Sequence, residues 1–401
     1  MKLKLLTAGP VQISENILKE ISQPIIYHRD PEFIAILKTV VSGIQYVLET
    51  KNDILIFTAS GTGGMEAVVV NLFSAGDSVL IIEQGKFSAR WAEICTCYGL
   101  EAAKIELPWG ESIDPEKIKQ ALRHNSEIKA VALTHCETST GALNDVKAVA
   151  QAIHDNSDAL IIVDVISTVG VIPFKMDEWK IDVAIASSNK GLLNPPGLAF
   201  IALNSRAWEI NQHSKLPKYY FSFQKTIDAF KSGIGSPFTP AISLIRGVHL
   251  AVEEIKQKRL ENIWEQHHKL ADAFRTAIHA MGLEILPARP SDSLTVIKIP
   301  DGLPANEIIA QLKNDYQIIV SKGQGQLKNR VIRIGHLGEL KPEDLAGVIT
   351  ALETILMKMG LKFKRDQAKR VFYNRLSSPM AMFLNPTSNK EFKNSPLMQE
   401  R

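Results

Sequence analysis

Short apolar runs alternate with amphipathic stretches up to about residue 248. Runs such as Leu160-Ile161-Ile162-Val163 place apolar side chains at consecutive positions, which is typical of strands buried on both faces of a sheet. Strands are predicted at 53–57, 78–82, 101–106, 129–134, 159–163, 182–186 and 198–202, and helices near 32–49, 65–73, 88–98, 115–124 and 146–154. This alternation predicts an α/β fold whose mostly parallel sheet is covered by helices on both faces, with right-handed crossovers.

The pattern changes after residue 248. One long helical periodicity runs over 249–281 without internal proline or glycine and ends at Gly282, a residue suited to the position after a helix. Strand-like segments at 294–299, 317–321 and 331–334, with helices near 305–316 and 342–359, predict a smaller α+β domain. We therefore divide the chain into an N-terminal segment (1–15) that packs with the small domain, a large α/β domain (16–248), the small domain (249–360) and a basic, mobile C-terminal tail (361–401).

Composition narrows the class of protein. The chain of 401 residues is 45% hydrophobic and 22% charged, with a net charge of +3 that is too small to indicate nucleic-acid binding. From residue 361 onward nine Lys/Arg face three Asp/Glu, so the basic excess belongs to the tail, which could dock on the body, a membrane surface or a partner. No apolar run is long enough to span a bilayer. Three cysteines without a Cys-x-x-Cys pair argue against a disulfide framework or a zinc site, and favour the cytoplasm.

A glycine-rich turn, Ser60-Gly61-Thr62-Gly63-Gly64, lies between a predicted strand and a predicted helix. The N–H groups at a helix N-terminus favour a phosphate, and glycines allow its close approach to the backbone. The turn has neither the Walker spacing nor the Gly-x-Gly-x-x-Gly spacing, which disfavours nucleotide and dinucleotide binding. A tight turn without a ligand is the alternative interpretation.

Three charged residues accompany apolar strands. Asp164 ends the run 160–163, Lys190 follows the run 183–186 in a loop rich in glycine and proline, and Arg333 lies inside Val331-Ile332-Arg333-Ile334. A lysine at such a place suits a Schiff base, an aspartate suits a protonated ring nitrogen, and an arginine suits a carboxylate. The ordinary alternatives are a solvent-exposed lysine, a turn-capping aspartate and an arginine in a structural ion pair.

The carboxyl ends of parallel strands meet at one edge of an open α/β sheet, where such sheets bind ligands. The glycine-rich turn, Asp164 and Lys190 all fall at such ends. A phosphate cradle, a carboxylate and a lysine together match the needs of pyridoxal 5′-phosphate. The pair His135-Cys136 also follows a strand, but adjacent residues on a strand point to opposite faces, which disfavours a thiol protease.

Over about residues 5–360 the sequence resembles the class V, fold-type I aminotransferases that depend on pyridoxal 5′-phosphate, and specifically the alanine–glyoxylate / serine–pyruvate group. The motifs that carry this resemblance are Thr7-Ala8-Gly9-Pro10, His28-Arg29-Asp30-Pro31-Glu32-Phe33, Ser60-Gly61-Thr62-Gly63-Gly64-Met65-Glu66-Ala67, Glu137-Thr138-Ser139-Thr140-Gly141, Asp164, Ser188-Asn189-Lys190, Pro195-Pro196-Gly197 and Arg333-Ile334-Gly335.

The resemblance implies a role for each site residue. Lys190 would form the Schiff base with the cofactor and later move the proton, while Asp164 would keep the pyridine nitrogen protonated. Cofactor contacts would come from Ser60, Gly61 and Thr62 at the phosphate, Phe87 stacked on the ring, Ser139 beside O3′, and Asn189 at the phosphate or ring. The substrate would meet Gly9 and Arg333, the latter at its α-carboxylate. Thr239 would reach the phosphate of a neighbouring subunit, so the resemblance also implies a homodimer with shared sites.

The expected reaction is transamination between a small L-amino acid, alanine or serine, and a 2-oxo acid such as glyoxylate or pyruvate. Asn189 departs from the group, which usually has glutamine there, and with the run His135-Cys136-Glu137-Thr138 it is similar to 2-aminoethylphosphonate–pyruvate aminotransferases. A lyase of the cysteine desulfurase type is a weaker alternative, because no cysteine follows Cys136. A non-catalytic relative acting as a binding protein is the remaining one.

Overall fold

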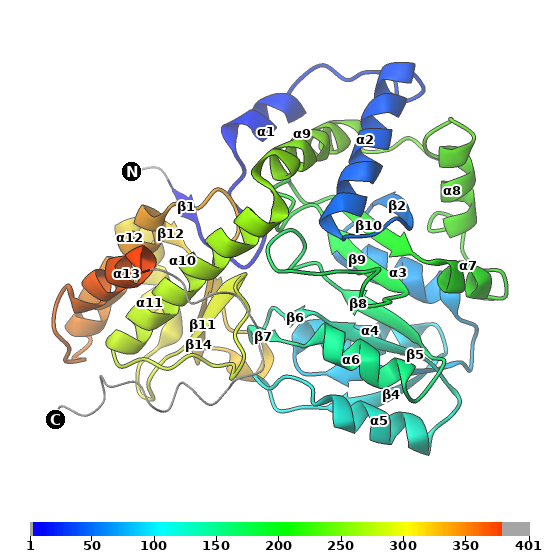
Figure 1. The fold of residues 1–401 in the computed structure, drawn as a ribbon. Helices are drawn as coiled ribbons and strands as arrows, with labels where there is room; N and C mark the ends of the chain where they lie inside the picture. The colour runs from blue at the N-terminus through cyan, green and yellow to red at the C-terminus, as the bar shows by residue number, and fades with distance from the viewer. Residues whose placement is uncertain (1–2, 379–401) are drawn as a thin grey trace.

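A computed structural model describes residues 3–378 of the chain (Figure 1). Its largest sheet has the strand order β2-β10-β9-β8-β5-β3-β4, in which β10 is antiparallel to its two neighbours and the other pairs are parallel. These strands span Asp53–Thr58 (β2), Ser78–Glu83 (β3), Glu101–Glu106 (β4), Ile128–Thr134 (β5), Leu160–Asp164 (β8), Val183–Ser187 (β9) and Leu198–Leu203 (β10). The predicted α/β fold is confirmed.

Helices cover both faces of this sheet, and the alternation of side chains along each strand supplies the two apolar layers. Along β8, Ile161 and Val163 pack into one layer with α2, α5, α6 and α9, whereas Leu160 and Ile162 pack into the other with α3, α4, α7 and α8. The helices span Pro31–Val47 (α2), Gly61–Leu72 (α3), Lys86–Cys97 (α4), Pro115–His124 (α5), Val146–His154 (α6), Ser205–Asn211 (α7), Phe223–Lys231 (α8) and Ile242–Lys258 (α9).

A second, smaller apolar core forms around a three-stranded antiparallel sheet with the order β11-β14-β13. Its elements are α10 (Leu260–Ala280), β11 (Leu294–Lys298), α11 (Ala305–Tyr316), β13 (Ser321–Lys322), η1 (Gly325–Leu327), β14 (Val331–Gly335) and α12 (Pro342–Lys358). The N-terminal segment joins this part of the molecule, because β1 (Lys4–Leu5) pairs with β12 (Ile318–Ile319) and Leu6 packs into the same core. The remaining elements are α1 (Glu15–Ile21), β6 (Cys136–Glu137) and β7 (Ala142–Leu143).

The single helix expected over 249–281 is wrong, because α9 and α10 are separate helices. They meet at Arg259, whose φ of 66° is left-handed and breaks the helical path. Apolar residues of α9 such as Val252 pack with the large sheet, whereas those of α10 such as Phe274 pack with the small one. No residue at this break signals it in advance, since arginine rarely adopts this backbone conformation.

The prediction of a mobile tail from residue 361 onward is wrong for its first part. Residues Gln367–Ser377 form α13, and its side chains Ala368 and Phe372 are 1% and 0% exposed in the smaller core. Figure 1 shows α13 against α10 and α12. The rest of that predicted tail, from residue 379, lies outside the described residues. None of the helices within 3–378 combines the length and apolarity needed to cross a membrane.

Candidate active site

Parallel pairing brings the carboxyl ends of β8, β9 and β5 to one edge of the large sheet, and β2 ends at the same edge. Asp164 is the last residue of β8, and Lys190 follows β9 by three residues. Glu137 follows β5 in the short strand β6, and the N-terminus of α3 follows β2. Chain segments far apart in sequence therefore supply one site.

Lys190 is buried, with a residue exposure of 8%, so it is not the solvent-facing lysine of the ordinary alternative. Gly9 lies directly against its side chain: a Cβ on Gly9 would be 2.3 Å from Lys190 Cε and 3.0 Å from Nζ, and Gly9 has a φ of 124°. Burial lowers the pKa of Lys190 to about 8, while the nearby Asp164 raises it and Arg333 lowers it. The charges of Asp164 and Arg333 thus both act on Lys190.

Asp164 is 7% exposed, and burial raises the pKa of its carboxyl to about 7. Its Oδ1 accepts a hydrogen bond of 2.7 Å from the Ile166 amide. No Lys, Arg or His within residues 3–378 forms an ion pair with it. A buried carboxylate without a cationic partner is suited to a cation from outside the chain, such as a protonated ring nitrogen.

The glycine-rich turn begins α3. Ser60 is the N-cap, and its Oγ accepts a hydrogen bond of 3.4 Å from the Gly63 amide. Gly61 has no room for a side chain, because a Cβ there would be 2.4 Å from Ile166 Cδ1, next to the loop that holds Asp164. The first N–H groups of a helix have no partner within it, so this end of α3 is a suitable cradle for an anion.

Phe87 lies in the first turn of α4 and is half-buried. The guanidinium of Arg90, one turn later, lies over this ring with its Cζ 5.1 Å from the centroid. Its Nη1 donates a hydrogen bond of 2.9 Å to Thr62 Oγ1. Because Thr62 accepts from Arg90, its own hydroxyl hydrogen is left to donate elsewhere. Sequence reasoning missed Arg90, although its spacing of three residues from Phe87 on a helix places both on one face.

Arg333 on β14 is 6% exposed and held by two backbone carbonyls. Its Nε donates to the Lys322 oxygen at 2.9 Å, and its Nη1 donates to the Thr138 oxygen at 3.0 Å. Burial lowers the pKa of Arg333 to about 10 despite the nearby Glu137. No Asp or Glu of the described chain forms a salt bridge with it, so the structural ion pair of the ordinary alternative is not found there. Its remaining donors suit a carboxylate ligand.

Two other predicted residues use their polar groups inside the protein. The Ser139 hydroxyl is fully buried, donates to Glu137 Oε1 at 2.6 Å and accepts from the Lys86 amide at 3.0 Å. Asn189 is half-buried, and its Oδ1 accepts a hydrogen bond of 2.8 Å from Ser187 Oγ. A donor from Ser139 to a cofactor is therefore not available, whereas the amide nitrogen of Asn189 keeps its donors.

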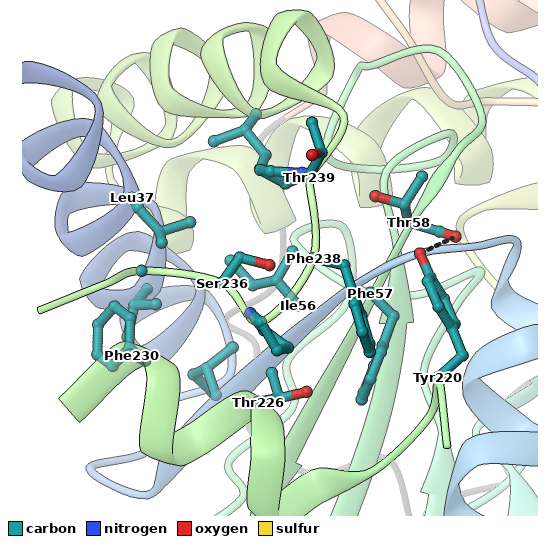
Figure 2. A pocket seen from close by; sticks show the side chains of 16 residues that line it. Leu37, Ile56, Phe57, Thr58, Tyr220, Thr226, Phe230, Ser236, Phe238 and Thr239 are labelled. Carbon is teal, nitrogen blue, oxygen red and sulfur yellow. Dashed lines mark hydrogen bonds between the residues drawn. The ribbon is translucent and has the colours of Figure 1, made fainter. Parts of the chain in front are cut away.

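Thr239 lines a cavity of about 30 Å³ between α2, β2 and α8, and Lys190 is not among the residues that line it (Figure 2). Thr58, the last residue of β2, contributes to the wall of this cavity, and the glycine-rich turn begins two residues later at Ser60. Tyr220 donates a hydrogen bond of 3.4 Å to the Thr58 oxygen and stacks on Phe238 at 5.2 Å between centroids. Tyr219 and Tyr220 are 70% and 41% exposed, so an aromatic surface borders Thr239.

His135 belongs to the core. Its ring is packed against Phe174 and Trp179, Nδ1 is 3.0 Å from Thr168 Oγ1, and burial lowers its pKa to about 3. Burial raises the pKa of the adjacent Cys136 thiol to about 11. A thiolate–imidazolium pair is thus strongly disfavoured. Residues 3–378 contain no group of three or more His, Cys, Asp or Glu side chains arranged to hold a metal ion.

Comparisons with known proteins agree with this geometry. The profile of the family described as Aminotransferase class-V matches residues 13–333. The chain is 37% identical to a protein of Synechococcus sp. named soluble hydrogenase, small subunit, over 90% of this chain and 94% of that one. It is 36% identical to the L-aspartate–glyoxylate aminotransferase of Paracoccus denitrificans, over 88% and 91% of the two chains. The crystal structure of an alanine–glyoxylate aminotransferase from Nostoc sp. superposes with a TM-score of 0.85 at 30% identity, covering 89% and 96%.

Proposed function

The chain belongs to the class-V aminotransferase family, and from this premise we propose that it transfers the amino group of a small L-amino acid, alanine or serine, to glyoxylate or pyruvate. The observation that carries the proposal is the buried Lys190, enclosed by Gly9 and within electrostatic reach of both Asp164 and Arg333. A lysine whose pKa is about 8 is partly neutral near pH 7, as a nucleophilic amine must be.

The family uses pyridoxal 5′-phosphate, and the residues of this site fit that cofactor. When bound, its ring accepts the electron pair released when the amino acid loses its Cα proton. We assign the phosphate to the N-terminus of α3, where Ser60, Gly61 and Thr62 offer two hydroxyls and free amides. Asp164, which has no cationic partner among the described residues, is assigned to the ring nitrogen, and a positive charge there would offset the cost of burying its carboxylate.

Lys190 Nζ is assigned as the covalent attachment point of the cofactor and, once released by the substrate amine, as the base that carries the Cα proton. Phe87 is assigned to the face of the ring, and the Asn189 amide nitrogen to a ring or phosphate oxygen. Arg333 would hold the substrate α-carboxylate with the donors that Lys322 and Thr138 leave unused, while Gly9 leaves room beside Lys190. Ser139 is left out, because its donor is already used by Glu137.

A homodimer is part of the proposal. The exposed Tyr219 and Tyr220 and the half-buried Phe238 form an aromatic surface beside Thr239, and exposed apolar patches commonly mark an interface. Covered by a second copy, this surface would carry Thr239 toward the partner's phosphate turn. Sedimentation velocity tests this: a dimer is expected, and Tyr219→Ser with Tyr220→Ser should weaken both dimerisation and cofactor binding. A cytoplasmic location is proposed on the three free cysteines alone.

The experiment that tests the function is spectroscopic. The purified protein should show the absorption of a lysine-bound cofactor, which Lys190→Ala removes and the exposed Lys215→Ala retains. L-alanine, L-serine, L-aspartate and 2-aminoethylphosphonate are then mixed with it singly, and the loss of that absorption is followed. Rapid loss with alanine or serine supports the proposal. Reaction with the phosphonate alone supports the alternative that Asn189 suggests, and no cofactor absorption in the wild-type protein refutes both.

A further inference from the structure

The carboxylate of Glu137 is fully buried and accepts hydrogen bonds from both sides. Oε2 accepts from the Ser88 amide at 2.8 Å and from the Phe87 amide at 3.1 Å. Oε1 accepts from the Ser139 amide at 3.0 Å and from the Ser139 hydroxyl at 2.6 Å. No Lys, Arg or His within residues 3–378 forms an ion pair with it, so all the hydrogen bonds to its carboxylate come from backbone amides and a hydroxyl.

Glu137 takes the place of a missing helix cap. The N-cap of α4 is Gly85, which has no side chain to accept from the first amides of the helix. The Glu137 carboxylate, 50 residues away in sequence, accepts from two of them and lies at the positive end of the helix dipole. Gly85 makes this approach possible, because a Cβ there would be 2.5 Å from Glu137 Cγ and 2.5 Å from Ser139 Oγ.

The turn that Glu137 holds carries two residues of the candidate site. Phe87 supplies one of the amides that Glu137 binds, and Arg90, over the Phe87 ring, donates to Thr62 in the phosphate turn. The next residue after Glu137, Thr138, supplies the carbonyl that accepts from Arg333 Nη1. The segment 137–139 thus contacts Phe87 on the ring side and Arg333 on the substrate side directly, and it is linked to the phosphate turn through Arg90 on α4.

We propose that Glu137 is a positioning residue, which fixes the first turn of α4 so that Phe87 stacks on the cofactor and Arg90 orients the Thr62 hydroxyl toward its phosphate. The inference rests on the proposed function, since it takes the cofactor to lie between Phe87 and Asp164. Glu137 itself touches neither cofactor nor substrate. In Glu137→Gln the side-chain NH₂ would replace one carboxylate oxygen and would face N–H donors instead of accepting from them. The amide could therefore accept hydrogen bonds either from Phe87 and Ser88 or from Ser139, but not from both sides.

The test compares Glu137→Gln with Asp182→Asn. Asp182 is also a fully buried carboxylate beside the large sheet, but it binds the Ile161 amide and Arg206 near the start of β9, away from the site. The first measurement is the hydrogen-exchange rate of individual backbone amides in both variants and the wild-type protein, all without cofactor. The amides of Phe87 and Ser88 should exchange at least tenfold faster in Glu137→Gln and unchanged in Asp182→Asn.

Cofactor titration is the second readout. Glu137→Gln should raise the dissociation constant of pyridoxal 5′-phosphate at least tenfold and weaken the circular dichroism of the bound ring, whereas Asp182→Asn should lower the melting temperature only. Wild-type affinity and dichroism in folded Glu137→Gln would overturn the inference. If Glu137→Gln does not fold, Gly85→Ala replaces it as the test variant, because the added Cβ would displace the Glu137 carboxylate without removing it. Wild-type cofactor affinity in Gly85→Ala would also overturn the inference. A wild-type protein that binds no cofactor would instead refute the proposed function.

Discussion

The pH dependence of the reaction of Lys190 with the cofactor is the most direct test of the proposed site. Burial lowers its pKa from 10.5 to about 8 in the cofactor-free protein. At pH 7 a pKa of 8 leaves about one tenth of the amine neutral, whereas a pKa of 10.5 leaves about one part in 3,000, so burial makes the reactive form roughly 300-fold more abundant. The rate at which pyridoxal 5′-phosphate adds to Lys190 should therefore rise tenfold per pH unit up to about pH 8 and level off above it.

The neighbours of Lys190 should shift this midpoint in opposite directions. Asp164 raises the pKa of the lysine and Arg333 lowers it, so Asp164→Asn should move the midpoint down and Arg333→Gln should move it up. Stopped-flow absorption over pH 6–10 measures the addition rate, and Lys190→Arg measures the background from other lysines. A rate that still climbs tenfold per unit above pH 9 in the wild-type protein would refute the reasoning, as would a shift of the same sign in both variants.

Four further results are expected. Burial raises the pKa of Asp164 to about 7 from an unfolded value near 3.8, so the folded cofactor-free protein loses stability as pH rises from about 3.8 to about 7. Asp164→Asn should therefore raise the melting temperature at pH 8 and much less at pH 4, as measured by calorimetry without cofactor. Arg333→Lys should lower kcat/KM for the amino donor by roughly 10- to 100-fold, about 1.5–3 kcal/mol, with the cofactor dissociation constant unchanged in the same preparation. Phe372→Ala should lower the free energy of unfolding by about 3–5 kcal/mol in urea titrations, because the ring is fully buried, yet leave the cofactor absorption intact. Arg259→Gly should raise the free energy of unfolding by about 1 kcal/mol, since glycine accepts the left-handed φ of 66° without strain. A urea midpoint equal to that of the wild-type protein would contradict this, and would show that contacts of the arginine side chain offset the backbone strain.

The large sheet could be predicted because its strands are continuous apolar runs, and the positions of Asp164 and Lys190 follow from it. Once strands 160–163 and 183–186 are parallel neighbours, the residues that follow them must lie at one edge. To place Arg333 at the same site, one must know that the small domain lies beside that edge, and periodicity alone does not show this. The prediction that Arg333 binds the substrate carboxylate therefore came from the resemblance.

The features that sequence reasoning missed depend on contacts between distant segments or on unusual backbone. Glu137 accepts hydrogen bonds from amides 49 and 50 residues earlier in the chain, and a carboxylate bound by amides leaves no pattern in either segment. The break at Arg259 occurs without glycine or proline, the usual signals. In α13 only Ala368 and Phe372 are buried, four residues apart in a strongly basic stretch, which is too weak a periodicity to distinguish from a tail.

One physical cause acts with opposite sign on the two charged residues at the centre of the site. Burial lowers the pKa of Lys190 and raises that of Asp164, so in the cofactor-free protein each is biased toward its neutral form. Under the proposed function, covalent attachment at Lys190 would remove the buried ammonium, and a protonated ring nitrogen beside Asp164 would give that carboxylate a cationic partner. Both changes relieve an unfavourable burial, so cofactor binding should stabilise the fold beyond the contacts at the phosphate, in line with the general stabilisation of a native state by its ligand. The same burial that disfavours a charged Lys190 also keeps part of its amine neutral, and the neutral amine is the form that reacts.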